Sequence, residues 1–214
     1  MKKLIIVLLI FTLVLVGCKT DAKIKESNQE KETTESTKLD VVINEKVMME
    51  YAYSGELKDM LKDSDFVTLI EVLDKEEAWI PKGSRLPQTA FKAKVIENLK
   101  GKLDVDEINV VLTGGTVKLK EFKLVNQNES NQKMGLNDMS EDDLEKKYIS
   151  IYPDAYTELE KGNTYIVFLK DYRDEGRKPN EYHLRMDGYG IYKKEGDFYK
   201  CKMWDTSVKK EAFK

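Results

Sequence analysis

The run DFVTLIEVL at residues 65–73 decides the fold, because it is apolar and β-branched over almost its whole length. Val, Ile and Phe fit the pleated, half-buried surface of a sheet better than most residues do. A continuous run of this length predicts a central strand that is buried on both faces. Strand signals then dominate the chain on its C-terminal side.

Those further strands follow at short intervals. The segment TAFKAKVIENL at residues 89–99 alternates between apolar and charged residues, and one face is expected to carry Phe91, Ala93, Val95 and Leu99. Other strands are predicted at residues 107–113, 163–169, 181–186, 190–194 and 198–200, the last two joined by a turn at 195–197. After Gly114-Gly115, which permits a tight turn or bulge, Val117 and Leu119 are expected to continue as a short return strand.

Helix signals are few. One helix is predicted over residues 54–62, with Ser54 as N-cap and a buried stripe of Leu57, Met60 and Leu61. A second opens at Ser140 and runs toward Lys147, inside a polar insertion at about residues 120–159. Loops this long are usually functional or disordered, and both alternatives stay open. Short strands, turn signals and one or two short helices predict a mainly β (α+β) fold, either a small barrel or a sandwich.

Three stretches carry a resemblance to a known family. They are residues 91–101 (FKAKVIENLKG), residues 108–110 (INV) and residues 159–168 (LEKGNTYIVF). In this order they resemble the netrin or tissue-inhibitor-of-metalloproteinase type of OB barrel, which implies a small five-stranded OB-like β-barrel of the binding-module kind. Members that inhibit metalloproteases insert an N-terminal Cys toward the zinc, and this domain has no Cys at its start. Protease inhibition is therefore not implied.

The N-terminus looks like an export signal. A basic start, Met1-Lys2-Lys3, precedes an apolar run from Leu4 to Val16. As a helix this run would reach about 20 Å, which is short of the roughly 30 Å hydrocarbon core, so a signal peptide is predicted. The sequence LVGC at residues 15–18 resembles the bacterial lipoprotein signal, which implies removal of residues 1–17 and attachment of a diacylglyceryl group, with acyl chains such as palmitate, to the thiol of Cys18. The alternative is an ordinary secretory signal.

The lipidated Cys18 would place the protein on the extracytoplasmic face of the cell membrane, with the lipid bilayer as its partner. Residues 18–40 contain only three apolar side chains after the Cys and are predicted to form a disordered linker. The globular domain is expected over residues 41–214. Because lipid occupies Cys18, Cys201 has no partner within the chain, and no intramolecular disulfide is expected.

Charge and motif content exclude several classes of function. The formal net charge is −3, and removal of Lys2 and Lys3 makes the chain more acidic, which argues against a general nucleic-acid binder. The sequence has one His and no HExxH or paired CxxC motif, so neither a metal nor another cofactor is expected. His183 lies in a predicted strand, where a pairing or surface role is expected rather than a catalytic one.

Cys201 stands between Lys200 and Lys202, whose ammonium groups could lower the pKa of its thiol. The sequence supplies no second His or Asn that would complete a nucleophilic site. We therefore expect a structural thiol.

One C-terminal constellation is a candidate binding surface. It interleaves aromatic rings with cations, a pattern that can stack on a sugar or a peptide. The residues expected to contact the ligand are Tyr182, Arg185, Tyr189 and Tyr192, and around them lie Phe198, Tyr199, Trp204, Lys193, Lys194, Lys200 and Lys202. The expected function is a non-catalytic module for an unknown protein or cell-wall ligand. The alternative is a cell-wall hydrolase or transferase that uses carboxylates such as Asp187.

Overall fold

The computed structural model of the chain describes residues 39–51, 56–172 and 179–214. Residues 38–214 form one compact unit. The predictions for the signal peptide, for Cys18, for most of the linker and for Ser54 as a helix cap lie outside the described residues. In the part that is described, no helix has the length and apolar character needed to cross a bilayer.

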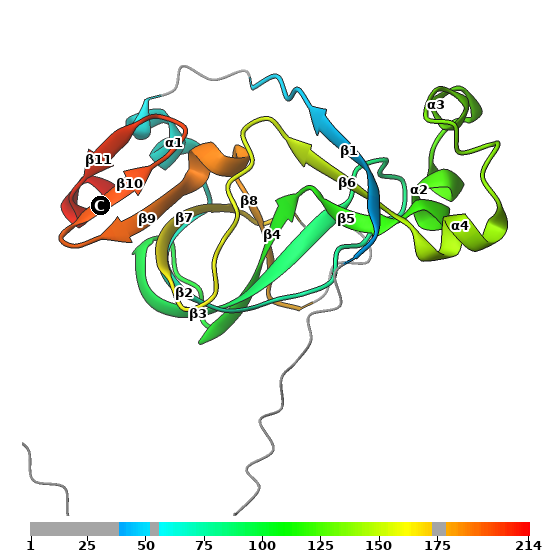
Figure 1. Cartoon of the computed structure of the whole chain (residues 1–214). Helices are drawn as coiled ribbons and strands as arrows, with labels where there is room; N and C mark the ends of the chain where they lie inside the picture. The colour runs from blue at the N-terminus through cyan, green and yellow to red at the C-terminus, as the bar shows by residue number, and fades with distance from the viewer. Residues whose placement is uncertain (1–38, 52–55, 173–178) are drawn as a thin grey trace, which may run out of the picture. The chain divides into compact units, whose positions relative to one another are not determined.

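A closed five-stranded barrel forms the centre of the domain (Figure 1). Its strands are β2 (Phe66–Lys75), β3 (Gln88–Lys100), β4 (Glu107–Thr113), β7 (Thr164–Lys170) and β8 (Glu181–Leu184). Around the ring the order is β2-β3-β4-β8-β7, and the β7–β8 pairing closes it. All neighbours are antiparallel except β4 and β8, which run parallel. The prediction of a mainly β fold with a small barrel is confirmed, and this strand order is compatible with an OB-type barrel.

The central strand β2 is buried on both faces, as its apolar run predicts. Ile70 and Val72 point to the barrel interior and belong to the first core, whereas Val67 and Leu69 belong to a second core outside the barrel. Between them on the interior side, Thr68 is fully buried, and its hydroxyl donates a 3.1 Å hydrogen bond to the carbonyl of Glu97. The two faces follow the period-2 alternation of a strand.

The second core lies under one outer face of the barrel. It is covered by a helix, three strands and a short 3-10 helix: α1 (Leu57–Asp63), β9 (Ile191–Glu195), β10 (Phe198–Cys201), β11 (Thr206–Val208) and η2 (Lys210–Phe213). Another 3-10 helix, η1 (Asp187–Gly190), joins β8 to β9. The predicted hairpin at residues 195–197 is present, since β9 and β10 pair across it. Helix α1 begins at Leu57, and Met60 is its buried residue.

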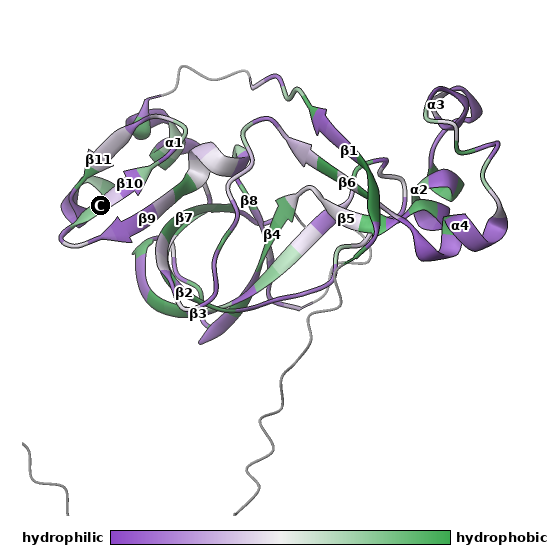
Figure 2. Cartoon of the chain, viewed as in Figure 1, coloured by the Kyte–Doolittle hydropathy of each residue, from purple (hydrophilic) through white to green (hydrophobic). Residues whose placement is uncertain are grey.

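A third core belongs to a separate three-stranded sheet, which carries the polar insertion. The sheet has the order β1-β6-β5, with β1 (Val41–Val47), β6 (Tyr148–Pro153) and β5 (Gly115–Lys118). The insertion holds three short helices, α2 (Leu119–Val125), α3 (Asn128–Lys133) and α4 (Glu141–Lys146), of which α2 and α4 contribute to the third core. Figure 2 shows α3 in hydrophilic colours, in keeping with its all-polar sequence NESNQK.

The structure changes two expectations about this region and adds two strands to it. The return strand after Gly114, which has a φ of +107°, does not pair with β4; it pairs with β6, and Leu119 already begins α2. Of the two alternatives left open for the insertion, functional or disordered, the structure excludes a wholly disordered loop, because α2, α4 and β6 contribute to the third core. The strands β1 and β6 were not anticipated. The predicted helix after Ser140 is confirmed, with the Ser140 side chain accepting a hydrogen bond from the backbone N–H of Asp143.

One residue of β3 lies on the other face from the one expected. Phe91, Ala93 and Val95 face the barrel interior, but Leu99 packs in the second core. The cause is irregular pairing with β2, where the register shifts between Leu69 and Ile70 and again between Val67 and Thr68. The first shift adds Ile96 on β3 between Val95 and Leu99, which reverses the alternation once, and in the second shift Leu99 is itself the added residue.

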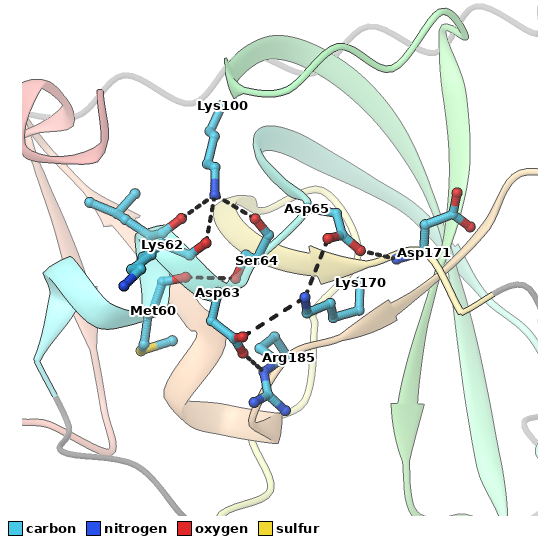
Figure 3. A network of polar contacts seen from close by, with 10 residues as sticks. Met60, Lys62, Asp63, Ser64, Asp65, Lys100, Lys170, Asp171 and Arg185 are labelled. Carbon is cyan, nitrogen blue, oxygen red and sulfur yellow. Dashed lines mark hydrogen bonds and ion pairs between the residues drawn. The ribbon is translucent and has the colours of Figure 1, made fainter.

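The residues that carry the family resemblance have local structural roles. Lys100 donates hydrogen bonds to three carbonyl groups at the end of α1, including those of Lys62 at 3.1 Å and Ser64 at 2.6 Å (Figure 3). A cation is favourable at a helix C-terminus. Gly101 follows with a φ of +70°, and a Cβ there would lie 2.6 Å from the carbonyl oxygen of Asp65. The Lys-Gly pair therefore joins α1 and the start of β2 to the end of β3.

The second motif, Leu159 to Tyr165, shapes the entry into β7. The Tyr165 hydroxyl accepts a 3.0 Å hydrogen bond from the backbone N–H of Glu160, five residues upstream. The N–H of Gly162 donates to the carbonyl of Val72 at 2.8 Å, and Leu159 is buried in the first core. The motif thus fixes the turn that brings β7 beside β2.

Candidate functional site

The four residues expected to contact a ligand do not form one surface. Tyr182 lies on β8 and packs edge-on against Phe66, with 5.4 Å between ring centroids. Tyr189 is in η1, with its ring 4.6 Å from that of Trp204. Tyr192 is only 2% exposed and packs against Phe168 in the second core. Burial also raises the pKa of the Tyr192 hydroxyl. We therefore assign Tyr192 a packing role.

Arg185 belongs to a polar network at the end of α1 (Figure 3). Its Nε donates a 2.6 Å hydrogen bond to Oδ2 of Asp63. Lys170 lies 3.3 Å from Asp65, and the same Asp65 carboxylate accepts a 2.9 Å hydrogen bond from the backbone N–H of Asp171. These contacts join α1 to the ends of β7 and β8, so Arg185 acts as a tether between elements.

Asp187 is a buried carboxylate and the residue named above for the enzymatic alternative. It is 6% exposed and accepts a hydrogen bond from the Tyr51 hydroxyl. Burial raises the pKa of Asp187, while hydrogen bonds from Tyr51 and Thr113 act in the opposite direction. Asp187 and Met186 before it both have positive φ, of +46° and +59°. Such backbone costs energy in non-glycine residues and persists only where the surroundings fix it.

The two other candidates for chemistry have structural surroundings. The ring of His183 packs edge-on against Tyr172, 5.4 Å away, and His183 pairs with Val111 and Lys170 in the sheets. Cys201 is fully buried, with its Sγ 3.6 Å from the carbonyl oxygen of Gly188. Burial raises the pKa of the Cys201 thiol, whereas a nucleophilic thiol needs a lowered pKa.

Part of the C-terminal constellation does converge on an open cleft. We call this the hairpin cleft; it has a volume of about 390 Å³ and lies between the β9–β10 hairpin and the segment before β7. Its lining residues are Tyr156, Thr157, Glu158, Glu160, Tyr165, Ile191, Lys193, Glu195, Lys200 and Lys202. Three of the lysines interleaved with aromatic rings in the sequence are therefore brought together, although none of the four expected contact residues lines the cleft.

The charges at the hairpin cleft are unequally engaged. Lys193 and Glu160 form a 2.5 Å ion pair, and Glu158 pairs with Lys75 at 2.5 Å. Lys200 has a long contact of 4.0 Å with Asp205, whose side chain is highly exposed. For Lys202 no ion pair occurs within the described residues. The ammonium groups of Lys200 and Lys202 are thus the ones best placed to meet an acidic group of a ligand.

Two hydroxyls beneath this cleft lack hydrogen-bond partners among the described residues. They are the buried Tyr156 OH and Thr157 Oγ1. Burial raises the pKa of Tyr156, so its hydroxyl keeps its proton and can donate. Buried polar groups are nearly always paired, with protein or with water, so these two hydroxyls are exceptions among the residues that line the cleft.

The segment at residues 154–163 was not anticipated as part of a site. Its sequence DAYTELEKGN mixes aromatic, hydroxyl and acidic residues directly before a strand, and that composition was the available signal. No group of three or more His, Cys, Asp or Glu side chains placed to hold a metal ion occurs in the described ranges. The sequence matches no protein-family model and none of the curated proteins with which it was compared.

Proposed function

We propose that the protein is a lipid-anchored membrane lipoprotein whose barrel domain is a non-catalytic binding module on the extracytoplasmic face. The observation that carries the binding role is the hairpin cleft, where Lys193, Lys200 and Lys202 converge at an open hollow. A few convergent polar groups in a concave site are typical of ligand binding. Anchoring rests on the sequence LVGC, with Cys18 as the lipidated residue. The ligand is a cell-wall component or another protein.

We further infer that the barrel is of the OB type and is related to the netrin-like domains. Support comes from the ring order β2-β3-β4-β8-β7 with its single parallel pair. The motif residues Lys100, Gly101 and Tyr165 add to it, because each shapes a junction of the barrel. OB barrels are binding folds for oligonucleotides and oligosaccharides, and the acidic net charge of this chain favours ligands other than nucleic acid.

An enzymatic role is the second candidate, and one observation favours it. The raised pKa of Asp187 would suit a general acid. However, Asp187 is almost fully buried and does not line the hairpin cleft. Two of the glutamates at that cleft, Glu158 and Glu160, are held in ion pairs. Binding is therefore the better-supported role.

The binding role can be tested by capture. Immobilised protein should retain a component of the cell-wall or secreted fractions of the host, and the double variant Lys200→Ala/Lys202→Ala should lose it. The double variant Lys102→Ala/Lys146→Ala is the matched control, because it removes the same charge from exposed sites away from the cleft. Equal capture by both double variants, or no capture by the wild type, would contradict the proposal.

Anchoring is tested at Cys18. The wild-type protein should enter the detergent phase on phase separation, and Cys18→Ala should move it to the aqueous phase, because the acyl chains would be missing. Partition of the variant into detergent would show that something else holds the protein on the membrane.

A further inference from the structure

A second hollow lies between the inserted sheet and the segment that follows β2. We call it the sheet cleft; it has a volume of about 480 Å³, within the roughly 300–1,000 Å³ of small-molecule sites. It shares no lining residue with the hairpin cleft. One wall is the β5–β6 part of the sheet, and the other includes Lys75 to Ala78 at the end of β2 and beyond it.

The sheet turns its hydroxyl-bearing face to this cleft. Along β6, Ile149 and Ile151 belong to the third core, so Tyr148, Ser150 and Tyr152 lie on the opposite face. On β5, Thr116 is directly opposite Ser150 and joins that face. Its Oγ1 is 2.7 Å from the Ser150 hydroxyl and 3.3 Å from the Tyr152 hydroxyl. Both tyrosines and Thr116 line the cleft.

The free charge at the sheet cleft is negative. Its two lysines are engaged elsewhere, Lys75 with Glu158 at 2.5 Å and Lys118 with Glu145 at 3.6 Å. Glu77, after β2, and Glu121, on α2, both line the cleft, and neither has an ion-pair partner among the residues described. A ligand that suits this lining must supply hydrogen-bond donors to carboxylates and carry no negative charge.

We propose that the sheet cleft binds a short neutral glycan. Sugar hydroxyls donate to the carboxylates of Glu77 and Glu121 and accept from the hydroxyls of Thr116 and the tyrosines. The C–H faces of the sugar rings pack on Tyr148 and Tyr152, which stand about 13 Å apart along β6 at roughly 3.3 Å per residue. The site extends the proposed binding function to a second ligand position, and its chemistry does not depend on the lysines of the hairpin cleft.

The walls of the sheet cleft are held in place before any ligand arrives. The Tyr152 ring packs on Tyr156 with 4.4 Å between centroids. The Lys75–Glu158 ion pair joins the end of β2 to the segment before β7. A site whose side chains are already fixed loses less freedom on binding, which favours affinity for an uncharged ligand.

The test is a titration of the full chain, kept in detergent, with cellobiose, maltose and N,N′-diacetylchitobiose, followed by saturation-transfer NMR and tyrosine fluorescence. Saturable binding of at least one disaccharide is expected. Tyr148→Ala and Glu121→Gln should each weaken it by about tenfold or more, because one removes a stacking ring and the other a charged acceptor. Thermal melting of both variants checks the fold, and Glu121→Gln keeps the test valid should Tyr148→Ala unfold.

Matched controls are Tyr172→Ala and Glu141→Gln, which remove an exposed ring and an exposed carboxylate outside the cleft and should bind as the wild type does. The glycan site is overturned if none of the three sugars binds, if Glu121→Gln binds with wild-type affinity, or if spermidine binds there in place of sugars. If the wild type captures no component at the hairpin cleft while sugar binding is intact, only the function proposed for that cleft is contradicted. The reverse result would contradict only the glycan site.

Discussion

The barrel and the inserted sheet differ in how many of their faces they bury. Strand β2 is apolar toward the first core and toward the second core. Strand β6 is apolar only toward the third core, and its other face carries Tyr148, Ser150 and Tyr152. Figure 1 shows the inserted helices α2–α4 on one side of the barrel and β9–β11 with α1 on the other. A strand that is buried on both faces contributes only to packing, whereas a strand that is buried on one face can also contribute side chains to a binding site.

This difference predicts that stability and binding are separated in the molecule. The barrel should set the global free energy of unfolding, because its strands contribute to two cores at once. The inserted sheet should tolerate local opening, because it depends on one smaller core and on short helices. Four variants test how far the separation goes.

The largest effect is expected from Phe91→Ala. Phe91 is fully buried in the first core, so truncation leaves a cavity and should destabilise the whole domain by about 3–5 kcal/mol. Urea denaturation followed by circular dichroism measures the loss. A loss below about 1 kcal/mol would mean that the barrel interior does not set global stability.

Phe122→Ala makes the equivalent change in the third core. Phe122 is 3% exposed on α2, and its loss should destabilise the inserted helices by about 3 kcal/mol, the low end of the range for a buried Phe. Hydrogen exchange should speed up for amides of α2 and α4, while amides of β2 and β7 keep their protection. If the barrel amides lose protection equally, the two regions unfold as one unit and the comparison fails.

A smaller, pH-dependent effect is expected at Asp187, which links the regions through Thr113 at the end of β4 and Tyr51 after β1. The pKa of Asp187 is raised, so the folded state holds the proton more tightly than the unfolded state does. This contribution is full below the unfolded pKa, near 4, and is lost as pH rises through the folded pKa. Asp187→Asn mimics the protonated form, so its melting temperature relative to the wild type should rise with pH from about 4 upward and then level off. A difference in melting temperature that stays constant between pH 3 and 8 would contradict this expectation. Asp154, whose charge also raises the pKa of Asp187, is present in both proteins.

The smallest effect is expected from Ser140→Ala. The Ser140 hydroxyl caps α4 through a 3.1 Å hydrogen bond from the N–H of Asp143, and loss of an N-cap costs about 1 kcal/mol. Because α4 is exposed and local, the change should appear as faster hydrogen exchange in α4 with little change in global melting. Ser140→Asp, which can still cap, should restore protection.

The barrel was largely predictable from the sequence, because its strands are recognisable by their apolar content. Residues 65–73, 107–113 and 163–169 each correspond to an observed barrel strand. The inserted strands gave weaker signals. In β6, YISIYP, the apolar positions are interrupted by tyrosines and a serine, and in β1, VVINEKV, three polar residues follow the apolar start. Their pairing joins segments about 100 residues apart, which local pattern cannot show.

The candidate site was predicted less well, for a physical reason. Aromatic residues serve packing and recognition equally, so a run rich in tyrosine does not reveal which rings are buried. Tyr192 packs in the second core, and Arg185 pairs with Asp63. The lysines were the better guide, since long charged side chains are rarely buried and Lys193, Lys200 and Lys202 do reach one cleft.

The buried thiol of Cys201 also makes local opening of the domain measurable. In a chain whose Cys18 is replaced, Cys201 is the sole cysteine, and it lies fully buried at the end of β10 with its thiol against η1. A thiol reagent can then react only when the C-terminal layer of β9, β10 and η1 opens locally, so the labelling rate reports how often it opens. The frequency of this local opening can thus be measured in the native protein, without denaturant and without adding a probe site.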